Sequence, residues 1–244
     1  MQPSTVFITG VSSGIGHALA AEYLKRGCRV IGLSRQVPRD LTDHASFSFA
    51  SADLSDVEVA ATAIRQLAAG LPRLDLVVLN AGVLGSFGDI GDADVQEMKK
   101  VMDVNLWANK TVLDTLFALQ VPISQIVSMS SGAAVNGNRG WRGYAISKAA
   151  LNMLTMLYAT EHSATHFCAL APGLVDTPMQ DQLAAVPHDE RYPSLDVIRG
   201  KRETAEMPKP SKLAARLIEV IAGLPDLVAS GEFADIRKPP IANG

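Results

Sequence analysis

Short apolar runs alternate with amphipathic stretches along most of the chain. The runs Thr5–Thr9 and Arg29–Ser34 are rich in β-branched and aliphatic residues, which is typical of strands. Leu74–Leu79 is apolar at nearly every position, as in a strand that is covered on both faces. The predicted strands are Thr5–Thr9, Arg29–Ser34, Ala45–Ala50, Leu74–Leu79, Ser124–Ser130, His166–Ala171 and Asp226–Phe233.

Between these runs, apolar residues recur at the spacing of one helix face. Ile15, Leu19 and Tyr23 follow this spacing, and Gly27 ends the pattern. Ser55 stands where it can cap the next helix. The predicted helices are Ile15–Arg26, Ser55–Ala69, Asp94–Leu119, Gly143–His162 and Ser211–Ala222.

The order of these elements indicates the fold class. Strands that alternate with helices predict an α/β fold with a doubly wound parallel sheet (Rossmann-like), in which ligands bind beyond the carboxyl ends of the strands. A chain of 244 residues fits a single domain, 1–244. The stretch 180–207 carries mixed charges and spaced apolar residues, which predicts a small helical flap on the substrate side; a long surface loop is the alternative.

Composition narrows the function classes. Apolar residues make up 48% of the chain and charged residues 19%, which indicates a globular protein with a large core. A net charge of −3 without a basic run argues against a nucleic-acid partner. The N-terminal apolar run Val6–Ile8 is too short for a signal or membrane segment, and Cys28 and Cys168 are too few for a disulfide framework. We therefore expect a cytoplasmic protein without a membrane partner.

A glycine-rich turn between the first strand and first helix predicts a phosphate site. Gly10 permits the tight turn, Gly14 lets a pyrophosphate approach the backbone, and Gly16 allows the helix to pack closely on the strand. Free N–H groups and the positive end of the helix then face the anion. The spacing differs from the common dinucleotide fingerprint, and a purely structural turn also needs glycines.

The end of the second strand carries information on the nucleotide. A site for NAD(H) is expected to have an acid there, but the next acid in this chain is Asp40. Arg35 can pair with a ribose 2′-phosphate and Ser34 can hydrogen-bond it, so NADP(H) is favoured. A solvated surface role for Arg35 is the alternative.

Tyr144 and Lys148 are the candidates for proton transfer. They lie four residues apart near the start of a long helix and so share one face. An ammonium group beside a phenol favours the phenolate, which lowers the tyrosine pKa towards neutrality. Ser131, after the fifth strand, can hydrogen-bond a carbonyl oxygen, and Asn105 can orient Lys148 through water. Each residue also has an ordinary structural explanation, such as a turn at Ser131.

These motifs together resemble the short-chain dehydrogenase/reductase family. Asn105, Ser131, Tyr144 and Lys148 match its catalytic tetrad, and further matches extend in order from Thr9 to Thr177. The resemblance implies cofactor contacts by Gly10, Ser12, Ser13, Gly14, Ile15, Gly16, Ser34, Arg35, Asp53, Leu54, Asn80, Ala81, Gly82, Tyr144, Lys148, Pro172, Gly173, Val175 and Thr177.

What the family implies about mechanism agrees with the residues. NADPH supplies a hydride to a carbonyl carbon, and Tyr144 supplies the proton to the oxygen. Lys148 lowers the tyrosine pKa and binds the nicotinamide ribose. Ser131 polarises the carbonyl, and Asn105 supports a proton relay.

Two segments resemble the sepiapterin reductase and benzil reductase branch. They are the stretch 130–144 and the C-terminal stretch 230–235, where Asp235 matches an aspartate that holds a pterin; a structural aspartate is the alternative. We expect the substrate to be a compact, aromatic or vicinal-dicarbonyl ketone. Its candidate contacts are Ser131, Trp141, Tyr144, Leu174, Met179 and Leu183, although Trp141 also suits a core or interface position.

Several alternatives stay open at this stage. The enzyme could act in the oxidative direction, or the fold could serve as a nucleotide sensor without turnover. The helices Asp94–Leu119 and Gly143–His162 carry extra apolar residues, and in this family such helices pair in dimers or tetramers, although core packing explains them too. No metal is expected, because His162 and His166 do not share a helix face.

Overall fold

A computed structural model of the chain describes residues 3–243, and its centre is a seven-stranded sheet in the order β3-β2-β1-β4-β5-β6-β7. All neighbouring strands are parallel; in β1, for example, Phe7 pairs with Ile31 of β2 and with Val77 of β4. The strands are β1 (Thr5–Thr9), β2 (Arg29–Ser34), β3 (Phe47–Ser51), β4 (Leu74–Leu79), β5 (Ile123–Met129), β6 (His166–Ala171) and β7 (Phe233–Asp235).

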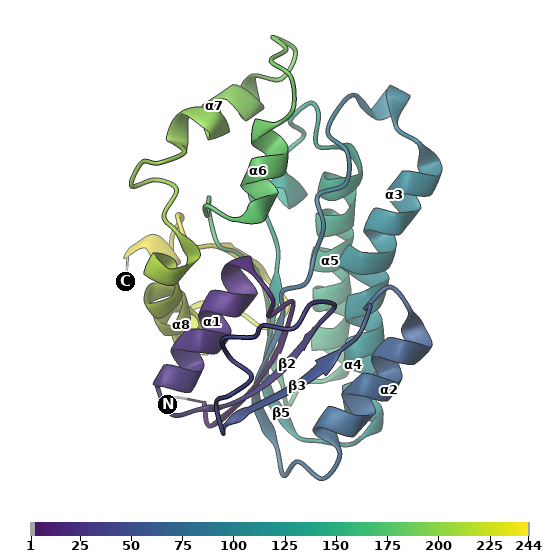
Figure 1. Cartoon of the computed structure of the whole chain (residues 1–244), viewed down its shortest axis with the longest axis vertical. Helices are drawn as coiled ribbons and strands as arrows, with labels where there is room; N and C mark the ends of the chain where they lie inside the picture. Colours follow the sequence, from purple (N-terminus) through teal and green to yellow (C-terminus); the bar gives the residue numbers. More distant parts are fainter. Residues whose placement is uncertain (1–2, 244) are drawn as a thin grey trace.

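Helices cover both faces of this sheet (Figure 1). Helices α1 and α8 pack together on one face, whereas α2, α4 and α5 lie on the other. The helices are α1 (Gly14–Lys25), α2 (Val57–Ala68), α3 (Val95–Met102), α4 (Ala108–Ala118), α5 (Arg142–Glu161), α6 (Pro178–Ala184), α7 (Pro193–Lys201) and α8 (Pro210–Leu227). Short 3₁₀ turns are η1 (Ile90–Asp92), η3 (Gly132–Val135) and η4 (Ile241–Asn243), and η2 (Asp103–Trp107) is a π-helical turn.

Successive side chains along a strand point to opposite faces of the sheet and fill two apolar cores. Val6 and Ile8 of β1 enter one core with Leu19 of α1 and Leu217 of α8, while Phe7 enters the opposite core. This is the period of two that a strand imposes on its side chains. The predicted doubly wound parallel sheet in a single domain is therefore confirmed.

The predicted strand Asp226–Phe233 is wrong. Helix α8 continues to Leu227, and β7 begins only at Phe233. Packing explains the longer helix, because the buried stripe of α8 reaches Leu224 in the core under the sheet. Strand β7 forms where β6 offers backbone partners, from Ala169 to Ala171.

Two local predictions also need correction. Asp56, rather than Ser55, caps α2, because its side chain accepts a hydrogen bond from Val59 N at 3.1 Å. The predicted helix Asp94–Leu119 is divided into α3, the π-helical turn η2 and α4. Such π turns are frequently found at functional sites.

The stretch 178–207, which we call the α6–α7 segment, lies beyond the end of the sheet (Figure 1). Leu183 and Leu195, one from each helix, are buried in a third apolar cluster together with Trp141 and Tyr144. The segment is therefore packed against the start of α5 rather than forming an extended surface loop.

Candidate active site

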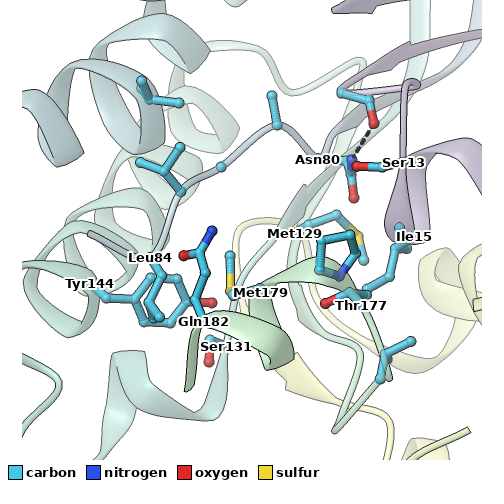
Figure 2. Close-up of a pocket in the computed structure, with 18 of the residues that line it drawn as sticks. Ser13, Ile15, Asn80, Leu84, Met129, Ser131, Tyr144, Thr177, Met179 and Gln182 are labelled. Atoms are coloured by element: carbon cyan, nitrogen blue, oxygen red, sulfur yellow. Dashed lines mark hydrogen bonds between the residues drawn. The ribbon is translucent and has the colours of Figure 1, made fainter. Parts of the chain in front are cut away.

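A cavity of about 420 Å³ opens at the carboxyl ends of the strands. Gly10, Ser34, Asn80, Ser130 and Pro172 line it, and these residues end or directly follow β1, β2, β4, β5 and β6. The structure brings every predicted cofactor residue except Gly16 to its wall, every predicted substrate residue, and every predicted catalytic residue except Asn105. Figure 2 shows the cavity with Ser13, Ile15 and Asn80 towards one end and Tyr144 and Ser131 towards the other.

The glycine loop is shaped by close backbone contacts. Gly10 has a φ of +75°, and a Cβ there would lie 2.9 Å from Ala81 Cα. A Cβ on Gly16 would lie 2.3 Å from the carbonyl oxygen of Gly10, so Gly16 allows α1 to pack on the loop without itself reaching the cavity. Asn80 Nδ2 donates hydrogen bonds to the carbonyl oxygens of Thr9 (3.0 Å) and Gly10 (3.2 Å) and links this loop to the end of β4.

The N-terminus of α1 is suited to an anion. Its N-cap residue, Ser13, makes no side-chain capping bond, and the first turn contains no acidic residue. The positive end of the helix and its first amides are therefore not neutralised from within the helix. Ser12, Ser13, Gly14 and Ile15 all line the cavity, so this end fits the phosphate groups of a dinucleotide.

Arg35, at the end of β2, is an exposed cation on the cavity wall. Within residues 3–243 it forms no ion pair closer than 4.0 Å, so its guanidinium is available to a ligand. Asp53 lies on the same wall, and hydrogen bonds from Ser55, with a smaller contribution from the charge of Arg35, lower its pKa. Ser34 Oγ donates to the carbonyl oxygen of Gln36 at 2.7 Å, which leaves the hydroxyl oxygen free to accept.

Tyr144 and Lys148 are both buried at the other end of the cavity. Burial raises the pKa of Tyr144, and hydrogen bonding with Ser131 opposes the rise. Burial lowers the pKa of Lys148 to about 8. Lys148 Nζ donates to the carbonyl oxygen of Met129 at 2.7 Å and lies 5.8 Å from the centroid of the Tyr144 ring.

These shifts differ from the expectation that Lys148 lowers the pKa of Tyr144. In the protein by itself the effect of burial on the tyrosine pKa dominates. Removing a phenolate from water costs more free energy than hydrogen bonding with Ser131 offsets. Tyr144 therefore keeps its proton at neutral pH, which is the form of a proton donor. The ammonium form of Lys148 is lost as the pH rises through about 8.

Asn105 lies behind the cavity wall, within the π-helical turn η2. Its Oδ1 accepts from Val83 N at 2.7 Å, and its Nδ2 donates to Val83 O (2.8 Å) and Ser147 Oγ (2.9 Å). A Cβ on Gly82 would lie 3.2 Å from Asn105 Oδ1 and 3.5 Å from Lys148 Nζ, so the two side chains approach the same glycine. Asn105 thus ties the loop after β4 to α5.

The wall near Tyr144 and Ser131 is largely apolar. Trp141, Met179 and Leu183 pack in one cluster with Tyr144, and Leu174 also lines the cavity. Sequence reasoning missed a further set, which carries no motif because most of its members are apolar. These residues are Gln36, Ala52, Val83, Leu84, Val104, Met129, Ser130, Pro178, Gln180, Gln182 and Ile198.

Gln182 is the most informative of the missed residues. It comes from α6 and lines the same cavity as Tyr144, Ser131 and Met179 (Figure 2). Its amide makes no hydrogen bond to any other part of the chain that the structure describes, whereas Trp141 Nε1 is already bonded to Ser194 Oγ at 3.1 Å. Gln182 therefore adds an available polar group to an apolar wall.

Asp235 has a partner elsewhere. Its Oδ1 accepts from Arg237 N and Nε, each at 2.9 Å, and its Oδ2 accepts from Arg237 Nη2 at 2.6 Å. Neither residue lines the cavity. This arrangement favours the structural alternative for Asp235 over contact with a pterin.

The histidines considered for a metal have other neighbours. The ring of His162 stacks on Phe117 with centroids 3.7 Å apart, and His166 Nε2 bonds the carbonyl oxygen of Val228 at 2.9 Å. Burial raises the pKa of the Cys168 thiol to about 12.

Across residues 3–243, no helix has the length and apolarity needed to cross a membrane.

Comparisons with known proteins give independent evidence on the family of the chain. The family model described as short chain dehydrogenase matches residues 4–187. A benzil reductase ((S)-benzoin forming) of Bacillus cereus is 28% identical over 86% of this chain and 90% of its own. An NADPH-dependent pterin aldehyde reductase of Arabidopsis thaliana is 35% identical over 71% of this chain and 75% of its own.

The fold has a close match among solved structures. The crystal structure of a short chain dehydrogenase/reductase from Saccharomyces cerevisiae superposes with a TM-score of 0.82, at 25% identity and with 98% of each chain covered. Members of this family are oxidoreductases that bind a nicotinamide cofactor, and the cavity offers a phosphate site at one end and a buried Tyr–Lys pair at the other. On the fold, the cavity and the family model, the chain belongs to the short-chain dehydrogenase/reductase family of oxidoreductases.

Proposed function

We propose that the protein is an NADPH-dependent carbonyl reductase that acts on a small aromatic or vicinal-dicarbonyl ketone. The observation that carries the proposal is the pairing of two ends in one cavity: the uncapped start of α1 with Arg35 at one, and Ser131, Tyr144 and Lys148 at the other. Relatives named as benzil reductase and NADPH-dependent pterin aldehyde reductase support both the reaction and the cofactor.

The cofactor would be held along the loop and strand ends. Amides at the start of α1 would bind the pyrophosphate, and Arg35 would bind the 2′-phosphate of the adenosine ribose. Asp53 and Leu54 would contact the adenine, and the loop after β6, from Pro172 to Thr177, would flank the nicotinamide. When bound, NADPH supplies the hydride.

The protein's own contribution is positioning and proton transfer. Ser131 Oγ donates a hydrogen bond to the substrate carbonyl oxygen, which polarises the carbonyl. Tyr144 then donates its phenolic proton to the same oxygen, and the ammonium of Lys148 stabilises the phenolate that remains. The relatives named as reductases favour reduction over alcohol oxidation.

The wall around this end suits the proposed substrate class. Trp141, Met179 and Leu183 offer apolar contact for a ring, and Gln182 offers an amide to a second oxygen. A nucleotide sensor without turnover has no need of Ser131 and Tyr144 on the cavity wall, so the enzyme is the better reading.

We further propose that the protein forms a dimer or tetramer through α5. The apolar residues Val101, Val112, Leu151 and Tyr158 are buried in this chain's own core and need no partner. A different set is exposed, at 46–53%, on one face of α5 and on the neighbouring η2 turn: Trp107, Ile146, Met153, Met156 and Leu157. Large apolar side chains that are exposed on one face of a helix are typical of interfaces.

Tyr144→Phe tests the reductase. We expect the purified protein to oxidise NADPH with an aromatic 1,2-diketone, and the variant to lose roughly 100-fold or more of that rate because the proton donor is gone. The measurement is the decrease of nicotinamide absorbance, with NADPH affinity determined separately by fluorescence titration. NADPH affinity is expected to stay within about twofold, since the tyrosine ring is retained.

Tyr158→Phe is the matched control. Tyr158 lies on the same helix, but its hydroxyl bonds Asp114 and lies outside the cavity. We expect its NADPH oxidation rate to stay at the wild-type value. Wild-type turnover in Tyr144→Phe would remove the proposed mechanism.

A further inference from the structure

Ion pairs connect three segments of the chain beyond the substrate end of the cavity. Asp89 precedes η1, Arg139 lies in the loop before α5, and Arg191 lies between α6 and α7. Arg139 donates to both carboxylate oxygens of Asp89, from Nε at 2.7 Å and from Nη2 at 2.5 Å. Arg191 Nη1 donates to Asp89 Oδ2 at 2.9 Å. We call Asp89, Arg139 and Arg191 the clasp.

Aromatic side chains connect the same three segments beneath the clasp. The ring of Phe87 meets Trp141 edge-on at 5.4 Å and Tyr192 edge-on at 5.1 Å between centroids. The guanidinium of Arg191 lies 5.2 Å from the centroid of the Tyr192 ring. Ser194, at the start of α7, accepts the hydrogen bond from Trp141 Nε1.

The aromatic layer leads directly to the site. Trp141 lines the cavity, and its ring lies 5.9 Å from that of Tyr144. Leu183 of α6 belongs to the same buried cluster and also lines the cavity. The position of the α6–α7 segment therefore decides where the apolar substrate wall stands relative to Tyr144.

The clasp is the electrostatic part of this attachment. Hydrogen bonds from Arg139 lower the pKa of Asp89 to about 2, so the carboxylate is charged at any physiological pH. The side chain of Asp89 is 19% exposed, whereas those of Arg139 and Arg191 are 54% and 51% exposed. Dissolved salt reaches such a pair and weakens it.

Asp189 provides an internal comparison. It also binds Arg191, with Oδ2 at 2.6 Å from Nη2, but the two residues belong to the same short loop. The contact between Arg191 and Asp89 instead joins residues 102 positions apart. Removal of either carboxylate takes one negative charge from the same arginine, yet only the loss of Asp89 removes the ion pair between the α6–α7 segment and the loop after β4, where the ring contact of Phe87 with Tyr192 remains.

We propose that Asp89 is a positioning residue for substrate: through Arg191 it holds the α6–α7 segment, and with it the apolar wall, over Ser131 and Tyr144. The inference rests on the proposed carbonyl reductase. It predicts that Asp89 affects the KM of the carbonyl substrate and leaves NADPH binding unchanged, because none of Asp89, Arg139 and Arg191 lines the cavity.

The test compares Asp89→Asn with Asp189→Asn in the whole protein. We expect Asp89→Asn to raise the KM for an aromatic diketone roughly fivefold to tenfold, with kcat within about twofold, as for loss of one charge-assisted contact. Asp189→Asn keeps the KM near that of the wild type. The wild-type KM should also rise with KCl, and the KM of Asp89→Asn should not. Equal KM values and equal salt dependence in the two variants would overturn the proposal.

A second readout does not need turnover. Trypsin cleaves after arginine, and we expect cleavage at Arg191 to be several-fold faster in Asp89→Asn than in Asp189→Asn, because cleavage needs the segment to open. Arg191→Gln keeps the Asp89–Arg139 pair and should raise the KM as Asp89→Asn does; a wild-type KM in it would contradict the clasp. If the wild type reduces no carbonyl while cleavage follows this order, the proposed function fails and the attachment stands.

Discussion

At the residue scale, burial and hydrogen-bond partners determine which side chains can transfer a proton or bind a ligand. Tyr144 and Lys148 lie in the same buried end of the cavity, and loss of water moves their pKa values in opposite directions, each towards its neutral form. Tyr144 is thereby kept as an acid, while Lys148 remains charged only below about pH 8. Asp235, by contrast, has its oxygens occupied by Arg237, so an aspartate that matches a ligand-binding position need not bind a ligand.

Arg35 carries the proposed preference for NADPH. The Arg35→Ala substitution removes a cation that a 2′-phosphate would pair with, so we expect NADPH to bind roughly tenfold more weakly, as for loss of one charged hydrogen-bonded contact. NADH lacks that phosphate and should change by less than about twofold. Fluorescence titration with each reduced cofactor measures both dissociation constants.

Arg39→Ala supplies the control for net charge. Arg39 is exposed nearby in the sequence but does not line the cavity. Its removal should leave both affinities unchanged. Equal weakening of NADPH and NADH in Arg35→Ala would mean that Arg35 does not contact the phosphate.

At the element scale, the site depends on how closely helices and loops approach each other. The glycine loop, the start of α1 and the end of β4 meet around Gly10, Gly16 and Asn80 with no room for a further methyl group. The π-helical turn η2 places Asn105 against Val83 and Ser147, which joins two segments that flank Lys148. The packing at Gly16 and the hydrogen bonds of Asn105 involve no reacting atom, but both hold residues of the cavity wall in place.

Gly16→Ala tests this packing. The new Cβ would meet the carbonyl oxygen of Gly10 and the amide of Asn80, both at 2.3 Å, so α1 must move away from the loop. We expect a loss of about 1–3 kcal/mol in the free energy of unfolding, together with weaker NADPH binding. Denaturant unfolding and cofactor titration measure the two effects.

Gly200→Ala is the matched substitution in a helix with open space. A Cβ on Gly200, in α7, would meet no atom within 4 Å. We expect it to be neutral or to stabilise the protein by up to about 1 kcal/mol, because alanine favours a helix. Gly16→Ala behaving in the same way would show that α1 does not need this contact.

At the scale of the whole molecule, different helices cover the two faces of the sheet, and different elements line the two ends of the cavity. Helices α1 and α8 cover one face and α2, α4 and α5 the other, while the α6–α7 segment lies beyond the end of the sheet (Figure 1) and packs with Trp141 and Tyr144. Helix α5 belongs to two of these regions, because one side carries Tyr144 and Lys148 and the other carries exposed apolar side chains.

Leu157→Glu tests the proposed assembly. Leu157 is 52% exposed on α5, and a carboxylate in an apolar interface would lose its water without gaining a partner. We expect the oligomer to dissociate to a monomer, or to bind at least tenfold more weakly, as judged by size-exclusion chromatography with light scattering.

Val59→Glu places the same charge on α2, where Val59 is 46% exposed and distant in sequence from α5. It should leave the molecular mass unchanged. A wild-type protein that is monomeric at micromolar concentration would rule out the interface.

The predicted elements match the structure where the local sequence pattern was strong. The prediction failed where contacts with distant segments set the bounds of an element. Strands β1, β2, β4 and β6 begin and end where their apolar runs do, because a strand buried on both faces has few polar positions. The predicted strand Asp226–Phe233 failed, because α8 continues to Leu227 and backbone pairing with β6 begins only at Phe233. The predicted site residues converge because motifs that directly follow parallel strands must meet at one edge.

The chain's own order of residues determined the strand–helix alternation, the glycine turn and the spacing of Tyr144 and Lys148, since each depends on positions a few residues apart. Only the tertiary structure decided that burial opposes the expected pKa shift of Tyr144, that Asn105 and Gly16 stand behind the cavity wall, and that Asp89 reaches Arg191. These properties depend on dielectric surroundings and on contacts between distant segments, and no local pattern of residues encodes either one.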